Sequence, residues 1–359
     1  MQITRLDIRN FRRFGDVSLR PAPGVNVLVG ENGAGKTTVL EALHLMAYGR
    51  SFRGKPADGL IRQGAEALEV FVEWMTEDGR HRKVGMRHGG REWTGRLDGE
   101  DVSALGVLCA ALAVITFEPG SHNLIMGGAE GRRRFLDWGL FHVEPRFLDY
   151  WRRYARALKQ RNALLKSHAP SAQLDAWDHE LVAAGAPLTG YRERYVAELQ
   201  EPILRVAEAL APELQLFELD FAPGWRTDHG EFADALLVQR ERDRQSGFTS
   251  VGPHRADWGL KFATGLTRDH LSRGQAKSSA LAVLLGQAAH YAAHTGSWPV
   301  IALDDVASEL DATHQKRVFD WLRGVDAQVF VTGTQVPETL LKSPAGVNVF
   351  HVEQGLIQA

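Results

Sequence analysis

The stretch VNVLVGENGAGKTTVLEAL, residues 25–43, places an apolar run, a glycine-rich segment and the start of a helical pattern in direct succession. Its centre, GENGAGKTT at residues 30–38, fits the pattern G-x-x-x-x-G-K-[ST]. Gly30, Gly33 and Gly35 allow backbone N–H groups to turn toward an anion without a Cβ in the way. The helix N-terminus that follows adds about half a positive charge. The stretch therefore predicts a phosphate-binding loop that holds a nucleoside triphosphate.

Two side chains of this loop have roles that follow from their chemistry. Lys36 would hold the β- and γ-phosphates, and Thr37 would place its hydroxyl on Mg²⁺. ATP and Mg²⁺ are therefore the expected cofactors. The residues expected to bind the nucleotide from this loop are Gly30, Glu31, Asn32, Gly33, Ala34, Gly35, Lys36, Thr37 and Thr38.

A second motif, WPVIALDDV at residues 298–306, predicts a buried strand that ends in two carboxylates. Ligands of parallel sheets bind outside the carboxyl ends of the strands, which is where Asp304 and Asp305 would lie. Asp304 would hold Mg²⁺ through water, and Asp305 would orient or deprotonate the attacking water. Two adjacent acids could instead be a charge cluster at a helix N-terminus, but the phosphate-binding loop favours the metal site. We expect Lys36 and Asp305 to be catalytic, and Thr37 and Asp304 to hold the metal.

A third motif, LSRGQAKSSA at residues 271–280, begins as a capping box, with Ser272 as N-cap and Gln275 three positions on. Such boxes are common, so the order of motifs carries the argument. The succession of phosphate loop, SRGQ, strand with Asp-Asp and SELD resembles the ABC-type ATPase head. In that arrangement the helix end faces the γ-phosphate bound by a second copy, which implies an ATP-dependent homodimer. The residues expected to act in trans are Ser272, Arg273, Gly274 and Gln275.

The hydrophobic pattern divides the chain into three parts. Strand-like segments with one helix fill residues 1–120, long helical stretches follow to residue 245, and strands and helices alternate over 246–359. We therefore predict an α/β fold, with a discontinuous ATPase head of mixed sheet and helices (1–120 and 246–359) and a helical insertion, or arm (121–245). Punctuation within the insertion is expected at Gly185, Pro187, Gly190 and Pro202.

The insertion has an uneven charge distribution. Residues 130–168 hold ten Lys or Arg against four Asp or Glu, whereas residues 169–220 hold three against ten. Two solvated helices that pair electrostatically would explain this, and so would a basic ridge that faces nucleic-acid phosphates. The residues of that ridge are Arg132, Arg133, Arg134, Arg152, Arg153, Arg156, Lys159 and Arg161.

Composition limits the other classes of function. A net charge of −2 means that binding to nucleic acid would depend on local patches, since the whole chain does not attract it. The single Cys109 lies in an apolar stretch and is most simply a buried hydrophobe. The N-terminus lacks an export signal and no apolar run reaches membrane-spanning length, so we expect a cytoplasmic protein with no membrane partner.

Over essentially its whole length the sequence resembles the RecF family of bacterial recombinational-repair ATPases, which are related to SMC proteins. The discriminating segments are ITRLDIRNFRRF (3–14), GGAEGRRRFLDW (127–138) and SVGPHRADWGL (250–260). The resemblance implies weak, DNA-dependent ATP hydrolysis, binding to single-stranded or gapped DNA, and action with RecO and RecR to help load RecA. It also implies that Arg12 approaches the bound phosphates and that Ser308 and Asp311 lie at the dimer interface.

Three departures from the wider ABC pattern predict slow turnover, with ATP acting more as a dimer clamp than as fuel. TFEPG at residues 116–120 has no glutamine where transporter ATPases carry one. The strand at residues 327–334 ends in Thr332, Gly333 and Thr334 where those proteins place a histidine, and Asp305 is one methylene shorter than the usual glutamate. For GPHRAD, residues 252–257, the glycine and proline predict only a turn.

Two other classes of function compete with a DNA-repair ATPase. A nucleotide-binding subunit of an ABC transporter would share the phosphate loop, but the long interval from Lys36 to Ser272 and the missing histidine disfavour it. A structural clamp of the SMC type would need a much longer coiled coil than the insertion can supply.

Overall fold

The computed structural model describes residues 1–54, 59–90, 92–102, 104–341 and 347–358, and it divides into two compact units. Unit 1 comprises residues 1–122, 205–214 and 272–359, and unit 2 comprises residues 123–204 and 215–271. The expected boundary at residue 246 is wrong, because residues 257–262 pair with a strand of unit 2. The naming of an ATPase head and an arm stays a prediction.

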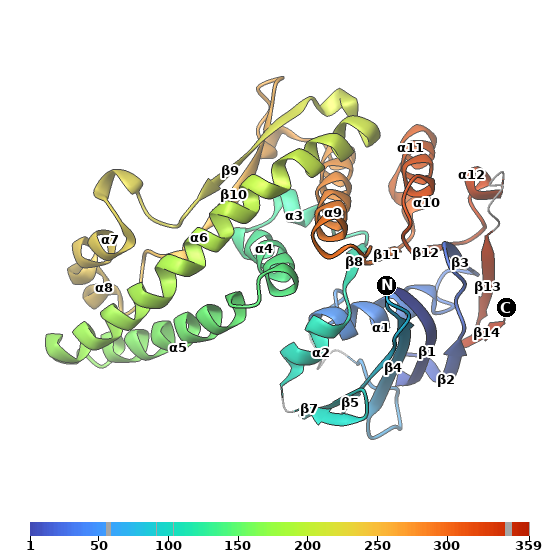
Figure 1. Ribbon diagram of the computed structural model, residues 1–359, viewed down its shortest axis with the longest axis horizontal. Helices are drawn as coiled ribbons and strands as arrows, with labels where there is room; N and C mark the ends of the chain where they lie inside the picture. Colours follow the sequence, from blue (N-terminus) through green and yellow to red (C-terminus); the bar gives the residue numbers. More distant parts are fainter. Residues whose placement is uncertain (55–58, 91, 103, 342–346, 359) are drawn as a thin grey trace. The chain divides into compact units, whose positions relative to one another are not determined.

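Unit 1 contains two six-stranded sheets (Figure 1). The first is antiparallel, and its strands in spatial order are β2 (Phe14–Leu19), β1 (Gln2–Phe11), β4 (Leu68–Met75), β5 (His81–His88), β6 (Trp93–Leu97) and β7 (Glu100–Val102). Alternating burial along β4 gives this sheet one core face and one solvated face.

The second sheet is mixed, and its parallel core strands are buried. Its order is β14 (Leu356–Gln358), β13 (Asn348–Glu353), β3 (Val25–Val29), β12 (Val329–Gly333), β11 (Val300–Leu303) and β8 (Val114–Phe117). All pairings from β13 to β8 are parallel, so the carboxyl ends of these strands share one edge. An α/β fold with a mixed sheet was predicted and is confirmed.

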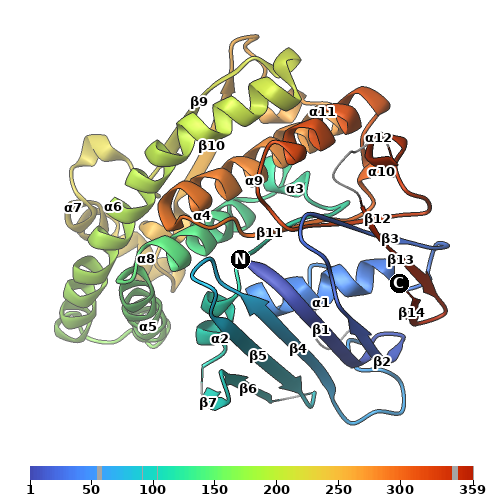
Figure 2. The same ribbon diagram turned by 45° about the vertical axis from the view of Figure 1, so that its right-hand side comes forward.

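Helix α1 (Lys36–Tyr48) lies between the two sheets (Figure 2). From Thr38 to Ala47 every residue of α1 is buried, because most of these side chains are apolar and the helix contacts both sheets. The other helices of unit 1 are α2 (Leu105–Ala111), α9 (Arg273–Thr295), α10 (Val306–Glu309), α11 (Ala312–Arg323) and α12 (Glu338–Leu341), with a 3₁₀ turn at Pro212–Leu214.

Unit 2 is mostly helical and contains one two-stranded antiparallel sheet of β9 (Leu216–Ala222) and β10 (Asp257–Phe262). Its helices are α3 (Asn123–Met126), α4 (Ala129–Val143), α5 (Phe147–Lys166), most of α6 (Ser171–Leu210), α7 (Phe232–Val238) and α8 (Arg240–Ser246). Short 3₁₀ turns occur at Thr227–His229, Pro253–Arg255 and Arg268–His270.

Two expectations about the insertion are wrong. The expected helix breaks at glycine and proline do not occur in α6. It is a single helix of 40 residues that contains Pro187 and Pro202. The Thr189 hydroxyl donates to the Gly185 carbonyl (3.0 Å), and buried apolar side chains along the helix hold it in place, so packing outweighs the cost of proline. Strand β9 lies in a stretch expected to be helical, because its partner β10 is distant in sequence.

Candidate functional site

The predicted strand, loop and helix around GENGAGKTT are β3, residues 30–35 and α1. Two glycines of the loop are sterically required. Gly30 has φ +159°, and a Cβ there would lie 2.2 Å from the Val352 carbonyl oxygen. Gly35 has φ +121°, and a Cβ there would lie 2.9 Å from the Phe14 ring. A larger residue at either position would therefore distort the loop.

Lys36 lies at the first position of α1 and is mostly buried. Its ammonium group donates to the loop carbonyls of Gly30 (2.7 Å) and Glu31 (2.9 Å). Burial lowers the pKa of Lys36, and the charges of Asp305 and Asp304 act in the opposite direction. The amine is thus held at the loop beside two carboxylates, where a phosphate can replace the carbonyls as its partner.

A pocket of about 300 Å³ opens at this loop. The residues that line it are Arg12, Arg13, Asn32, Gly33, Gly35, Lys36, Thr37, Thr38, Arg53, Asp305 and Thr332. Four of these side chains are cationic, so the pocket suits a polyanion.

Asp304 follows β11 directly, at the shared edge of the parallel strands. The Thr37 and Thr332 hydroxyls donate to one of its carboxylate oxygens, at 2.9 Å and 2.7 Å. Burial raises the pKa of Asp304, the two hydroxyl bonds lower it, and the neighbouring charge of Asp305 raises it further. A buried carboxylate beside a threonine hydroxyl and a phosphate loop fits Mg²⁺, which takes few protein ligands besides nucleotide phosphates.

No group of three or more His, Cys, Asp or Glu side chains among the described residues could hold a metal by itself. A Mg²⁺ ion that binds together with a nucleotide usually keeps several waters and takes few ligands from the protein. Thr37 and Asp304 are the side chains that would hold it.

Asp305 adopts a left-handed conformation (φ 51°, ψ 35°) as the N-cap of α10. Such a backbone is uncommon outside glycine and marks functional sites in many proteins. Its amide donates to Thr332 Oγ1 (2.9 Å), and Ser308 Oγ donates to its carboxylate (2.5 Å). Thr332 therefore links both aspartates.

Sequence reasoning missed two pocket residues, Arg13 and Arg53. Arg13 donates to the Gly33 carbonyl (3.0 Å) from the turn between β1 and β2. Arg53 reaches the pocket from the segment after α1, far from any motif. The expected Arg12 also lines the pocket, and its guanidinium forms two hydrogen bonds with the carboxylate of Glu41 (2.7 Å and 3.2 Å).

The Ser272 segment forms the capping box that its sequence indicates. Ser272 Oγ accepts from the Gln275 amide (3.2 Å), and the Gln275 side chain accepts from the Ser272 amide (2.9 Å). Ser272, Arg273 and Gly274 are exposed, and the segment is not part of the described lining of the Lys36 pocket. Asp311 is the N-cap of α11 and accepts from two of its amides.

The basic residues of the insertion fall into two groups. Arg132 is buried in an ion pair with Asp257 (2.6 Å), and Arg161 is buried against Asp178 (2.5 Å) and Asp243 (2.7 Å). These two arginines cannot face phosphates as placed, which corrects the expected ridge. Arg133 is partly buried and donates to a backbone carbonyl, and Arg134 and Arg153 are paired with glutamates on the surface. Exposed positions on α5 are Arg152, Arg156, Lys159 and also Lys166, which sequence reasoning had left out.

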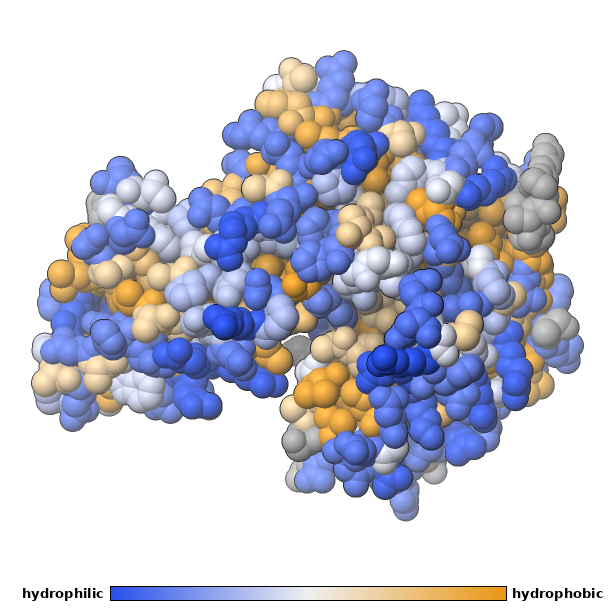
Figure 3. All heavy atoms as spheres, viewed as in Figure 1, coloured by the Kyte–Doolittle hydropathy of each residue, from blue (hydrophilic) through white to orange (hydrophobic). Residues whose placement is uncertain are grey.

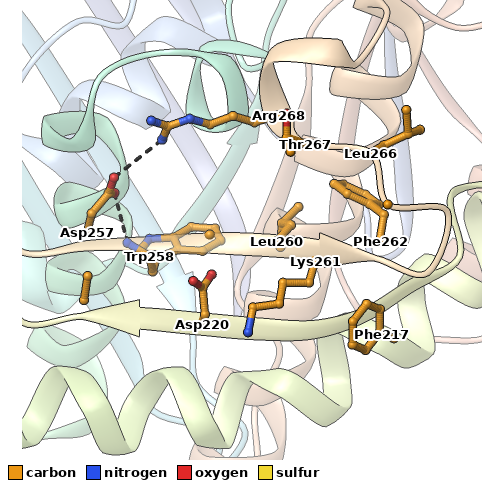
Figure 4. Close-up of a pocket in the computed structure, with 13 residues that line it drawn as sticks. Phe217, Asp220, Asp257, Trp258, Leu260, Lys261, Phe262, Leu266, Thr267 and Arg268 are labelled. Carbon is orange, nitrogen blue, oxygen red and sulfur yellow. Dashed lines mark hydrogen bonds and ion pairs between the residues drawn. The ribbon is translucent and has the colours of Figure 1, made fainter.

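Another hollow, of about 470 Å³, lies beside the β9–β10 pair in unit 2 (Figure 4). Phe217, Leu260 and Phe262 give it apolar walls, and Arg268 forms an ion pair with Asp257 (3.5 Å) at one end. The phosphate-binding loop lies in the described lining of the Lys36 pocket and not in that of this hollow. Among the described helices, none combines the length and the apolar character that a membrane crossing needs.

Comparison with known proteins places these features in a family. The family model described as "RecF/RecN/SMC N terminal domain" matches residues 2–358. "DNA replication and repair protein RecF" of Stenotrophomonas maltophilia is 61% identical, and the alignment covers 100% of both chains. The protein of the same name from Xanthomonas euvesicatoria is 62% identical over 99% of this chain and 98% of its own.

A solved structure described as "Structure of the recombination mediator protein RecF-ATP in RecFOR pathway" has the same fold, with a TM-score of 0.87. It is 24% identical and covers 99% of this chain and 97% of its own. The full-length matches disfavour the transporter-subunit alternative, and a cytoplasmic location stays a prediction. The chain belongs to the RecF family of DNA replication and repair proteins, within the wider RecF/RecN/SMC family of ABC-type ATPase heads.

Proposed function

We propose that this chain is an ATP-dependent DNA-binding protein of recombinational repair that hydrolyses ATP slowly. The observation that carries the proposal is the convergence of Lys36, Thr37, Asp304 and Asp305 on one pocket at the carboxyl edge of a parallel sheet. The name of its relatives, and a structural neighbour described as RecF with ATP, support the same function.

In this proposal each side chain has a defined task. Backbone N–H groups of residues 30–35 and the Lys36 ammonium bind the β- and γ-phosphates. Thr37 and Asp304 would hold Mg²⁺, and the ion would supply positive charge beside the phosphates. Asp305 orients the attacking water, and its carboxylate is free to accept a proton once Ser308 turns away.

Slow turnover follows from two features of this arrangement. Asp305 Oδ2 accepts a hydrogen bond from Ser308 Oγ, so the candidate base is partly engaged in a single chain. Thr332 supplies a hydroxyl that is bonded to both aspartates and so has little freedom to contact the γ-phosphate. Pairing with a second copy would have to rearrange this network before hydrolysis.

The exposed N-terminus of α9 supports a composite site in a homodimer. Ser272 and Gly274 present a hydroxyl and an amide at a helix end that attracts anions. We propose that Ser272–Gln275 bind the γ-phosphate on the partner, and that Ser308 and Asp311 lie near the same interface. RecR and RecO as partners, with an indirect role in RecA loading, belong to the same proposal.

For DNA we propose the exposed face of α5. Arg152, Arg156, Lys159 and Lys166 follow one another at helical spacing along this face. They span about 21 Å at 1.5 Å per residue, a length over which duplex DNA carries about twelve charges. Hydrophilic side chains cover much of α5 in Figure 3. Phosphates of single-stranded or gapped DNA fit a surface of this kind.

The deciding experiment is steady-state ATP hydrolysis at low and at high salt, without DNA, with linear duplex and with gapped duplex. We expect slow turnover that DNA accelerates. High salt should abolish this acceleration, because contacts with DNA phosphates release counterions. A Lys36→Ala variant is the control that should lose turnover under every condition. A rate of ATP hydrolysis that is the same with and without DNA at low salt would contradict the proposal.

A further inference from the structure

A carboxylate that belongs to no motif lies beneath the nucleotide pocket. Glu41 is on α1, about one and a half turns after Lys36, and its side chain is fully buried. A buried charge is stable only when it is paired and hydrogen-bonded. The fold must therefore supply partners for Glu41. Two of them are arginines that line the pocket from outside the phosphate loop.

Arg12 is held by two hydrogen bonds to Glu41, from Nη2 (2.7 Å) and from Nε (3.2 Å). The backbone at Arg12 is in the left-handed region (φ 55°), and its amide donates to the Leu60 carbonyl (2.7 Å). Strain at a non-glycine residue persists only where the surroundings fix it. The two-point contact with Glu41 fixes the plane of the guanidinium at the wall of the pocket.

Arg53 is tied to the same carboxylate. The Ser51 hydroxyl donates to Glu41, and Ser51 Oγ in turn accepts from the Arg53 amide (2.9 Å). The Arg53 guanidinium lies 3.9 Å from Glu41 Oε2, is half exposed and lines the pocket. Arg53 therefore shares the pocket with Asp305.

We propose that Glu41 is a positioning residue that holds Arg12 and Arg53 on the terminal phosphates of the bound nucleotide. Burial of Glu41 in α1 makes the geometry of both arginines depend on the helix that begins at the phosphate loop. Arginines that are oriented in advance bind a triphosphate at little further entropic cost. The consequence is a preference for ATP over ADP that depends on Glu41, a residue that touches neither nucleotide. This inference rests on the proposed nucleotide function of the same pocket.

The test is equilibrium binding of fluorescent ADP and of a fluorescent, non-hydrolysable ATP analogue to the full chain. Glu41→Gln keeps the size of the side chain and removes its charge. We expect about tenfold weaker binding of the ATP analogue, the equivalent of one charge-assisted hydrogen bond, and a much smaller change for ADP. Glu41→Asp, which keeps the charge, should recover part of the preference. Glu69→Gln, which removes an exposed carboxylate beside Arg87 and Arg9, is the matched control and should change neither affinity.

A double-mutant cycle separates positioning from general damage. Arg53→Gln alters a half-exposed side chain and should lower the ATP preference by itself. If Glu41 acts through Arg53, the double variant should lose less than the two single losses combined. If Glu41→Gln fails to fold, Arg53→Gln and Arg12→Gln decide the question. For both, the measured quantity is the affinity for the ATP analogue divided by the affinity for ADP.

Equal weakening of ATP and ADP in folded Glu41→Gln, or an unchanged ratio in the arginine variants, would overturn the inference. If the unmodified chain binds neither nucleotide, the proposed function fails instead, so the two failures are distinguishable.

Discussion

At the scale of single residues, two adjacent aspartates have different environments. Asp304 is almost fully buried and accepts hydroxyls from Thr37 and Thr332. Asp305 turns out of the strand in a left-handed conformation and is partly exposed. The proposed roles differ in the same way: Asp304 would hold the metal in a fixed place, and Asp305 would orient the attacking water.

Asp305→Asn tests this division of labour. The amide keeps the size of the side chain but cannot accept a proton, so hydrolysis should fall by about 10²-fold or more. ATP affinity should stay the same, since phosphate binding depends on Lys36 and the loop. Single-turnover hydrolysis and nucleotide binding measure the two effects. Asp320→Asn, on the exposed surface of α11, is the control. A variant with the turnover of the unmodified chain would remove Asp305 from catalysis.

His314 gives unit 1 a pH-dependent contact. Its ring nitrogens lie 2.6 Å from Asp311 Oδ2 and 2.6 Å from Glu213 Oε1. Burial lowers the pKa of His314, but the hydrogen bonds to the two carboxylates outweigh it, and the pKa is raised above the usual 6.5. The protonated imidazole therefore stabilises the fold fully below pH 6.5, and this contribution is lost as the pH rises through the raised pKa.

His314→Gln should therefore destabilise the protein by about 1 kcal/mol at pH 6 and by less at pH 9. Urea unfolding of both proteins at the two pH values measures the difference. If the difference in unfolding free energy stays constant or grows as the pH rises, the protonated imidazole does not stabilise the fold through these carboxylates.

At the scale of elements, α5 shows how one helix can carry basic residues of two kinds. Arg161 is on its buried face, where Asp243 Oδ2 and Thr249 Oγ1 accept hydrogen bonds from its Nη1 (2.7 Å and 2.8 Å). Arg156, five residues earlier, is on the exposed face. Nearby, the GPHRAD segment forms a 3₁₀ turn in which His254 accepts or donates one bond to Tyr154 (2.6 Å), so the segment helps to hold unit 2 together.

Arg161→Ala should destabilise unit 2 by about 3–5 kcal/mol, because it leaves the fully buried carboxylate of Asp243 without its cation. Hydrogen exchange of α5 and α8, together with the unfolding temperature, measures the loss. Arg156→Ala on the same helix should leave both values unchanged. An Arg161→Ala variant as stable as the unmodified chain would contradict the packing described above.

Arg156→Ala should act on DNA binding instead. The variant removes one phosphate contact from the proposed face of α5, so the slope of log affinity against log salt should shrink by about 0.9 for duplex DNA. Titrations with a labelled gapped duplex at several salt concentrations give the slope. Glu180, which pairs with Arg153 at the side of this face, offers the opposite control, because Glu180→Gln should not weaken binding. An unchanged slope in Arg156→Ala would place the DNA elsewhere.

At the scale of the whole molecule, the proposed nucleotide site would need two copies of the chain. The pocket at Lys36 has a phosphate loop and two aspartates, but its described lining does not include the exposed N-terminus of α9. Two copies related by a twofold axis would supply each pocket with the Ser272 segment of the other. Pairing would then depend on the γ-phosphate, which both copies contact.

Ser272→Arg should bind ATP with unchanged affinity and remain monomeric, because the larger cation blocks the helix end without touching the loop. Sedimentation velocity with and without a non-hydrolysable ATP analogue measures the association, and Lys36→Ala should stay monomeric for the different reason that it cannot bind nucleotide. A Ser272→Arg protein that dimerises normally, or an unmodified dimer without ATP, would refute a gate operated by the γ-phosphate.

The sequence by itself determined the phosphate loop, the strand with Asp304 and Asp305, the capping box at Ser272 and the α/β class. These features are local, since glycine spacing, apolar periodicity and caps set backbone conformation within a few residues. The family resemblance added Arg12, which the structure places at the pocket. Local signals misled at Pro187 and at β9, where contacts with distant residues outweigh propensity.

Only the tertiary structure decided which charged side chains are buried. Arg161 and Arg156 lie on the same helix, and what separates them is Asp243, a partner 82 residues from Arg161. In the sequence Glu41 is an ordinary helical residue. In the folded chain Arg12 and Arg53, from two other segments, lie beside its carboxylate. The physical reason is that a buried charge needs partners, and these partners come from residues distant in sequence. Such contacts form only when the chain closes long loops, so a local sequence pattern does not predict them.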